Sequence, residues 1–307
     1  MEISSVINQM LVLLIILVVG VIASKTGVIN ADANKSLSRI VLNIAQSAMI
    51  IGSVMNVDSG MNGKELLLMV VASFVMYALL FVLSFAVRAV LRVPKSDRGT
   101  YQFAAMFGNV AFIGFPVIAS FLGPEAVFYG ALFNIPFNIL IYSLGIYMIS
   151  GEKEKYHVKL KSFITMPLIS TAVAILLLVL NLKIPAPIED AAKLLGGMVV
   201  PSAMLIIGSS LGRISIKEVL GDWRVYAFAP LCLVVCPIIV WAIMKQFIHN
   251  PATLSVAVIM TSMPVGANTT ILCMEHKGNE VLSSKLIFVT TVLSMVTIPF
   301  VLSLLLG

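Results

Sequence analysis

The chain has 307 residues, of which 60% are hydrophobic and only 11% are charged, and its formal net charge is +6. A soluble domain carries about 25% charged residues, so this composition leaves too few polar side chains to cover a water-facing globule. The excess of positive charge does not indicate nucleic-acid binding, because the basic residues sit in short loops between apolar runs. We therefore expect a polytopic membrane protein.

Charged residues divide the chain into apolar windows, and a helix needs about 20 apolar residues to cross the hydrocarbon core. No window alternates in polarity as a barrel strand would, so an all-α membrane protein with ten transmembrane helices is predicted. The start of the chain lacks the basic residues of a signal peptide, so the first run is expected to be a retained helix. The ten windows lie between Glu2 and Lys25, Arg39 and Asp58, Glu65 and Arg88, Arg98 and Glu125, Glu125 and Glu152, Lys161 and Lys183, Lys193 and Arg213, Arg224 and Lys245, Lys245 and Glu275, and Lys285 and Gly307.

The orientation follows from the distribution of Lys and Arg, which are enriched in cytoplasmic loops. If the N-terminus lies outside, the inner loops hold sixteen of the twenty Lys and Arg residues. The sequence therefore predicts a multi-pass protein of the cell (inner) membrane with both termini extracytoplasmic.

An internal repeat is visible at a constant offset. The segment around Ser47 resembles the segment around Ser202, and these two serines are 155 positions apart. The turns that begin at Gly123 and Gly278 show the same shift. Because two unrelated matches share one offset, the chain is predicted to contain two homologous halves.

The halves are predicted to cover residues 1–150 and 162–307, with a cytoplasmic linker at 151–161. Each half holds five helices, so the second half must enter the membrane from the opposite side. This inverted topology is typical of secondary transporters, which bind substrate near the midplane on interrupted helices.

Spans four and nine carry helix-breaking residues at membrane depth. Proline removes a backbone donor, and glycine lowers the free energy needed to open a helix. Freed backbone groups persist in a membrane only inside protein or beside a wet cavity. The residues concerned are Asn109, Gly114 and Pro116 in span four, and Pro264, Gly266 and Asn268 in span nine.

The two interruptions agree in chemistry but not residue by residue. Both amides could face one central point, but at the offset of 155 Asn109 corresponds to Pro264 rather than to Asn268. The predicted site therefore need not be symmetric.

Three motifs resemble those of the auxin efflux carrier family, a family of bacterial, archaeal and plant permeases related in fold to the bile acid sodium symporters. They are Asn-x-x-Phe-x-Gly-x-Pro at 109–116, Pro-Ser-Ala-Met-x-x-x-Gly-x-x-Leu at 201–211, and Pro-x-x-x-Asn at 264–268. The resemblance covers the whole chain and implies that spans four and nine cross at their broken middles. It also implies a scaffold of spans 1, 2, 6 and 7, a moving transport domain of spans 3–5 and 8–10, and a homodimer formed through the scaffold.

No ionisable side chain lies in the middle of any span. Proton relays and intramembrane proteases need such groups, so we expect neither an enzyme nor a bound cofactor or metal. A broken helix instead exposes N–H groups at the positive end of a half-helix dipole, where a carboxylate binds without a cation. Asn109 and Asn268 would add amide donors, and Gln46, Ser47 and Ser202 could complete the binding site from the scaffold.

The predicted function is therefore a permease for a small organic anion, most naturally a carboxylate, that works by an elevator-type motion. An inside-negative potential favours the exit of one negative charge by about 2.3 kcal/mol per 100 mV, so efflux needs no coupling ion. Two alternatives stay open at the level of sequence: a Na⁺- or H⁺-coupled symporter of the same fold, and a membrane receptor that does not transport.

Overall fold

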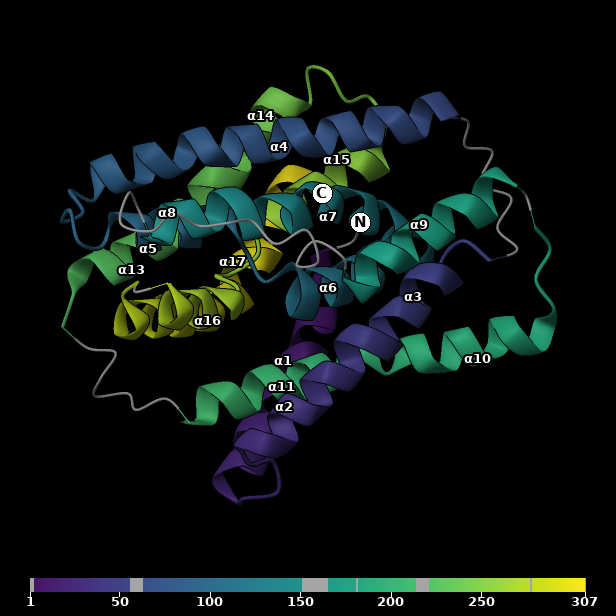
Figure 1. The fold of residues 1–307 in the computed structure, drawn as a ribbon, viewed down its shortest axis with the longest axis horizontal. Coiled ribbons are helices and arrows are strands. Elements are labelled where there is room, and N and C mark those ends of the chain that lie inside the picture. The colour runs from purple at the N-terminus through teal and green to yellow at the C-terminus, as the bar shows by residue number, and fades with distance from the viewer. Residues whose placement is uncertain are drawn as a thin grey trace.

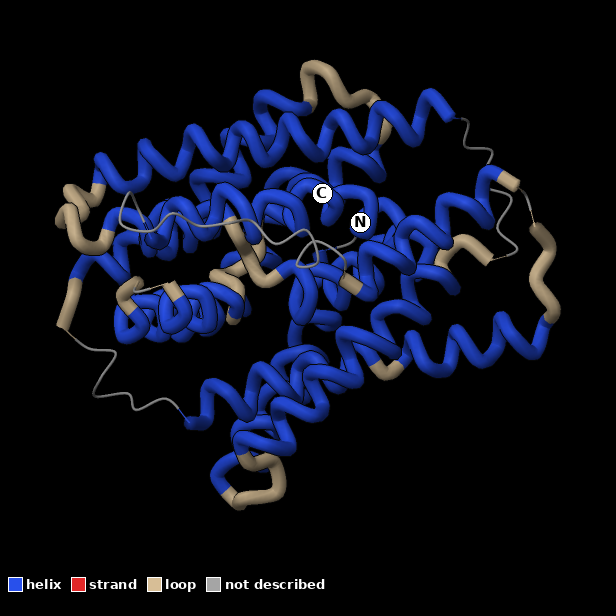
Figure 2. The backbone as a smooth tube through the Cα atoms, viewed as in Figure 1, coloured by secondary structure: helices blue, strands red, loops and turns tan. Residues whose placement is uncertain are grey.

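The computed structural model describes residues 3–55, 63–150, 165–180, 182–213, 221–276 and 278–306. Helices make up almost all of these ranges, and no extended strand is found within them (Figures 1 and 2). The α-helices are α1 (Ile3–Lys25), α2 (Ala31–Ile40), α3 (Gln46–Gly52), α4 (Gly63–Val90), α5 (Arg98–Met106), α6 (Phe115–Leu122), α7 (Val127–Leu140), α8 (Ile146–Ser150), α9 (Met166–Val179), α10 (Ala186–Gly197), α11 (Val199–Arg213), α13 (Trp223–Pro230), α14 (Cys236–Met244), α15 (Pro251–Thr261), α16 (Asn268–Glu275) and α17 (Glu280–Leu306).

Three pairs of neighbouring helices join through single π-helical turns, Val41–Ala45, Ile141–Gly145 and Leu231–Val235, so that two labelled helices form one longer rod. A further π-helical turn, Val110–Gly114, leads into α6, and a short 3₁₀ turn, Pro124–Ala126, precedes α7. Such turns insert one extra residue into a helix and are frequent at functional sites.

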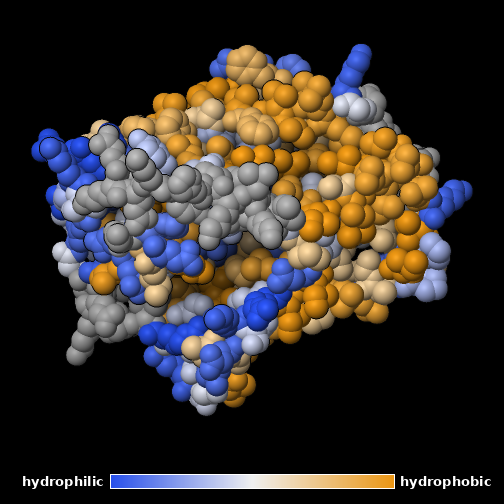
Figure 3. All heavy atoms as spheres, in the orientation of Figure 1, coloured by the Kyte–Doolittle hydropathy of each residue, from blue (hydrophilic) through white to orange (hydrophobic). Residues whose placement is uncertain are grey.

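Helical segments fall within all ten predicted windows. Within the described residues, five helical stretches are long and apolar enough to cross a membrane: Gly63–Val90, Pro124–Ser150, Ala186–Arg213, Trp223–Met244 and Glu280–Leu306. Shorter apolar helices, including Met166–Val179 and Pro251–Thr261, accompany them. Apolar side chains cover much of the face in Figure 3, with hydrophilic side chains gathered toward its left and lower edges. The predicted class of helical polytopic membrane protein is therefore confirmed, and the inverted ten-helix repeat stays a prediction.

Helix boundaries recur at the offset that the sequence repeat shows. Helix α2 begins at Ala31 and α10 begins at Ala186, and these residues are 155 positions apart. Helix α5 ends at Met106 and α15 ends at Thr261, which gives the same separation. Equivalent positions in the two halves thus begin and end helices alike.

The helices pack in two groups. In the first, α1 lies along α11, and α3 contacts α9 and α10; most of these helices lie together in the lower half of Figure 1. In the second, α4 contacts α5 and α7, α14 contacts α15, and α13 contacts α17. The family resemblance implies that the first group belongs to the scaffold and the second to the transport domain, and this division and their relative motion stay predictions.

Glycines allow α1 and α11 to approach each other closely. A β-carbon at Gly20 would stand 2.6 Å from the carbonyl oxygen of Leu205, and one at Gly208 would collide with the carbonyl of Leu17. Lipid is as apolar as a leucine side chain, so helices in a membrane associate through close packing of small residues. Gly20 and Gly208 therefore hold the first group together.

Candidate functional site

Spans four and nine are both interrupted, as the sequence predicts. In span four α5 ends at Met106, and regular α-helix resumes at Phe115. In span nine α15 ends at Thr261, and α16 begins at Asn268. Pro264 lies within the second interruption, and since it has no N–H it cannot continue the helical hydrogen bonds.

The two interruptions contact each other through the backbone. Gly108 and Val265 form an isolated antiparallel bridge. The N–H of Asn109 donates to the carbonyl oxygen of Pro264 at 2.6 Å, and the N–H of Gly266 donates to that of Phe107 at 3.2 Å. The first bond joins the two residues that correspond at the repeat offset of 155. We call this contact the crossing, and it comprises residues 107–109 and 264–266.

Glycine at position 266 is needed for this approach. A β-carbon there would lie 3.1 Å from the carbonyl oxygen of Gly108 and 3.2 Å from that of Phe107. These distances are shorter than ordinary carbon–oxygen contacts, so a larger residue would push the two backbones apart. Gly266 therefore serves the contact between the spans as well as the break in its own helix.

Asn109 is buried and caps the second half of span four. Its side-chain oxygen accepts a hydrogen bond from the N–H of Phe112 at 3.3 Å, which is the usual role of asparagine at a helix start. Its own N–H is used by Pro264. Its side-chain NH₂ group has no partner among the described residues, so the amide donor that the sequence predicts for a ligand is available, and ligand binding by Asn109 stays a prediction.

Gly114 and Pro116 are also buried in span four. The N–H of Gly114 donates to the carbonyl of Asn109 at 3.1 Å, which closes the π-helical turn. Pro116 lies in the first turn of α6, where a missing N–H does no harm. Both residues shape the half-helix and offer no polar side chain to a ligand.

Asn268 is the first residue of α16, and both it and Ala267 are exposed. The N–H groups of Ala267 and Asn268 have no acceptor among the described residues, whereas that of Thr269 donates to the carbonyl of Gly266. The start of α16 therefore presents two free peptide donors and one side-chain amide at the positive end of a helix. These groups are suited to bind an anion.

The scaffold residues predicted for the site lie at different places. Ser202 is half-buried on α11, and α11 contacts the turn Val110–Gly114 next to the crossing. Gln46 follows the π-helical turn Val41–Ala45, is 0% exposed, and has both amide atoms without a partner in the described structure. The hydroxyl of Ser47 is likewise buried and without a partner there. Both side chains therefore have hydrogen-bonding capacity that no described residue uses.

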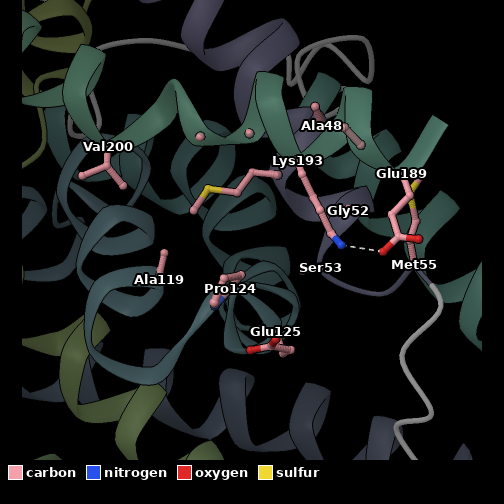
Figure 4. Close-up of a pocket in the computed structure, with 14 residues that line it drawn as sticks. Ala48, Gly52, Ser53, Met55, Ala119, Pro124, Glu125, Glu189, Lys193 and Val200 are labelled. Atoms are coloured by element: carbon pink, nitrogen blue, oxygen red, sulfur yellow. Dashed lines mark ion pairs between the residues drawn. The ribbon is translucent and has the colours of Figure 1, made fainter. Parts of the chain in front are cut away.

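A cavity of about 520 Å³ lies between α3, α6 and α10 (Figure 4). Most of its lining is small and apolar, and Glu125, Glu189 and Lys193 supply its charges. The ammonium of Lys193 lies 2.6 Å from the carboxylate of Glu189, one turn earlier on α10. Span four connects the crossing with this cavity, because the turn Val110–Gly114 and α6 lead from Asn109 to Ala119 in the cavity wall.

The polar residues of the predicted site do not mark this cavity. Ala48 and Met49, which line it, belong to the repeated motif around Ser47. That motif is the available signal in the sequence, because small residues leave space between helices.

The fold and the crossing define a helical membrane protein built around two interrupted helices. Residues 5–302 match the family described as membrane transport protein, and the chain belongs to this family. It is 25% identical over 298 residues to an uncharacterized transporter of Methanothermobacter thermautotrophicus, covering 95% of this chain and 96% of the relative. It is 24% identical over 297 residues to an uncharacterized transporter of Methanocaldococcus jannaschii, with the same coverage of each chain.

Membership in this family confirms that the chain is a membrane transport protein, as the motifs predict. It also agrees with the expectation that the protein is not an enzyme. The relationship in fold to bile acid sodium symporters stays a prediction.

Proposed function

We propose that the protein is a secondary transporter that carries a small organic anion, most naturally a carboxylate, across the cell membrane by an elevator-type motion. The observation that carries this proposal is the start of α16, where the N–H groups of Ala267 and Asn268 have no acceptor in the described structure. A helix start is equivalent to about half a positive charge, so these donors attract a carboxylate without a basic side chain. The side chain of Asn268 would add a third donor.

The free NH₂ group of Asn109 and the unpartnered amide of Gln46 would complete the binding of the substrate. Gln46 lies on the scaffold, whereas Asn109 and Asn268 lie on the group of helices proposed to move. When that group shifts, the substrate would exchange its scaffold neighbours and keep its contacts with α16. A substrate that reaches Gln46 would take up the hydrogen-bonding capacity of its amide, which no described residue uses.

Access from both sides is a requirement of this mechanism. The cavity at Glu125 and Lys193 opens between the two groups of helices. It lies near one end of spans two, four and seven, and the distribution of Lys and Arg predicts that this end faces the outside. A hollow in the surface between the arm built by α2 and α11 and the body of the molecule supports a second approach (Figure 3). The membrane potential would drive efflux of the anion without a coupling ion.

A thermal-shift screen of organic anions on the purified protein tests the proposal. At least one small carboxylate should raise the melting temperature of the wild type, and Asn268→Ala should lose this shift while melting at the wild-type temperature without ligand, because its side chain is exposed. Asn109→Ala should melt at a lower temperature without ligand, because it loses a helix cap. A ligand that stabilises the wild type and Asn268→Ala equally would contradict the assignment of the site.

A further inference from the structure

The cavity between α3, α6 and α10 has the size and the lining of a pocket for a small molecule. Its volume of about 520 Å³ falls within the range of about 300–1,000 Å³ that such pockets occupy, and it is too small for a whole phospholipid. The apolar part of its lining consists of alanines, glycines, two methionines, one proline and one valine. Methionine adapts to irregular shapes and makes favourable contacts with aromatic rings. This part of the lining therefore suits the hydrocarbon body of a ligand, an aromatic ring included.

The polar part of the lining leaves one negative charge uncompensated. The hydroxyl of Ser53 donates to the carbonyl of Ile50 at 2.6 Å, so it offers no free donor. Lys193 and Glu189 form an ion pair at 2.6 Å, and their charges offset each other. Glu125 makes no hydrogen bond and no ion pair with any described residue. It lies across the space from α10 (Figure 4), where its carboxylate can accept hydrogen bonds from a molecule in the cavity.

We infer that this cavity binds an amphipathic organic amine. The ammonium group has three N–H donors for the carboxylate of Glu125, and the apolar body packs against the small residues and the methionines. An anion fits the cavity less well, because the one cation of the lining, Lys193, is already paired with Glu189. A neutral molecule leaves the charge of Glu125 without a partner. The inference goes beyond the proposed function, because the amine would bind here whether or not the protein carries an organic anion.

A ligand in this cavity would touch both groups of helices. One wall comes from α3 and α10, which lie in the first group. The other wall comes from α6 and the turn Pro124–Ala126, and both of these contact α7, which lies in the second group. A bound amine would therefore bridge the two groups, oppose any motion of one against the other, and obstruct the route that this cavity gives to the anion.

The test is isothermal titration calorimetry on the protein in nanodiscs of phosphatidylcholine, with the heat from empty nanodiscs subtracted. The three probes share one aromatic body and differ in charge: phenethylamine, phenethyl alcohol and phenylacetate. The wild type should bind the amine about fivefold more tightly than the alcohol, because an exposed ion pair changes affinity by a few-fold.

Two variants separate the charge of the cavity from its shape. Glu125→Gln removes the charge of an exposed side chain and keeps its size, so the amine and the alcohol should bind it equally. Its control is Glu280→Gln, because Glu280 corresponds to Glu125 at the offset of 155, is also exposed, and lies outside the cavity. Ala119→Leu enlarges a side chain of the lining and should weaken the binding of amine and alcohol alike. Its control, Ala172→Leu, changes an exposed residue of α9 outside the cavity and should bind both probes as the wild type does.

Four outcomes would overturn the inference. They are the absence of amine binding to the wild type, equal binding of amine and alcohol to the wild type, a preference for the amine that Glu125→Gln retains, and full affinity for the amine in Ala119→Leu. Binding of phenylacetate that exceeds that of the alcohol and is lost in Ala119→Leu would assign the cavity to the anion and also overturn it. The donors at the start of α16 are tested separately by Asn268→Ala, so the amine site and the proposed function can fail independently.

Discussion

Replacing Gly266 by alanine perturbs the crossing more directly than any other single substitution. The added β-carbon would lie 3.1 Å and 3.2 Å from two backbone carbonyl oxygens of span four, so the two spans must separate by a few tenths of an ångström. The bonds at stake are the one from Asn109 to Pro264, at 2.6 Å, and the one from Gly266 to Phe107, at 3.2 Å. Overpacking of this kind costs about 1–3 kcal/mol, which lowers the melting temperature of a chain of this size by about 3–10 °C.

The assay is thermal unfolding of Gly266→Ala in detergent, followed by tryptophan fluorescence. Gly197→Ala is the control, because a β-carbon at Gly197 meets nothing within 4 Å and alanine is the better helix former. The control should melt at the wild-type temperature or slightly above it. If Gly266→Ala melts together with the control, the spans do not depend on a close backbone contact, and the description of the crossing is wrong.

Three further substitutions test the roles assigned to individual residues. Asn109→Ala should lose the cap on Phe112 and about 1 kcal/mol of stability, measured as a lower melting temperature. Asn109→Ser should recover part of this stability. Equal melting temperatures of the wild type and both variants would contradict the cap. Gly208→Leu should abolish the packing of α11 on the carbonyl of Leu17. The yield of monodisperse protein on size-exclusion chromatography should therefore fall sharply. A normal yield would contradict the close packing of α1 against α11. Lys193→Ala should change the melting temperature by less than about 1 °C. The side chain of Lys193 is 62% exposed, and exposed ion pairs contribute little to the free energy of unfolding. A large drop in melting temperature would show that Lys193 also holds the two groups of helices together.

The local chemistry of the chain predicts the helices and their breaks. Charged residues bound the helical windows, and a proline such as Pro264 ends a hydrogen-bonding pattern wherever it lies. The offset between Ser47 and Ser202 also predicts the recurrence of helix boundaries, because homologous segments carry the same helix starts and stops. These features depend on neighbours in the sequence and can be read without the fold.

Other features depend on tertiary contacts and could not be predicted. The π-helical turn Val41–Ala45 carries no residue that marks it, and it packs against α9, α10 and α11, which are distant in sequence. The sequence does not predict that the side-chain oxygen of Asn109 caps Phe112, because this bond depends on the backbone angles after the break. The burial of Gln46 without a partner depends on which helices surround it. Whether Gln46, Ser47 and Ser202 bind substrate stays a prediction.

Counterflow across proteoliposomes tests the central claim most directly, which is that the free donors at the start of α16 carry an organic anion through the membrane. Vesicles loaded with an unlabelled small carboxylate should accumulate the labelled compound from outside when they contain the wild-type protein. Asn268→Asp, whose carboxylate repels the anion, should lose this exchange. Gly63→Ala should retain it, because a β-carbon at Gly63 meets nothing within 4 Å and Gly63 does not line the cavity. If no small organic anion exchanges through the wild type, or if Asn268→Asp exchanges at the wild-type rate, the account is contradicted.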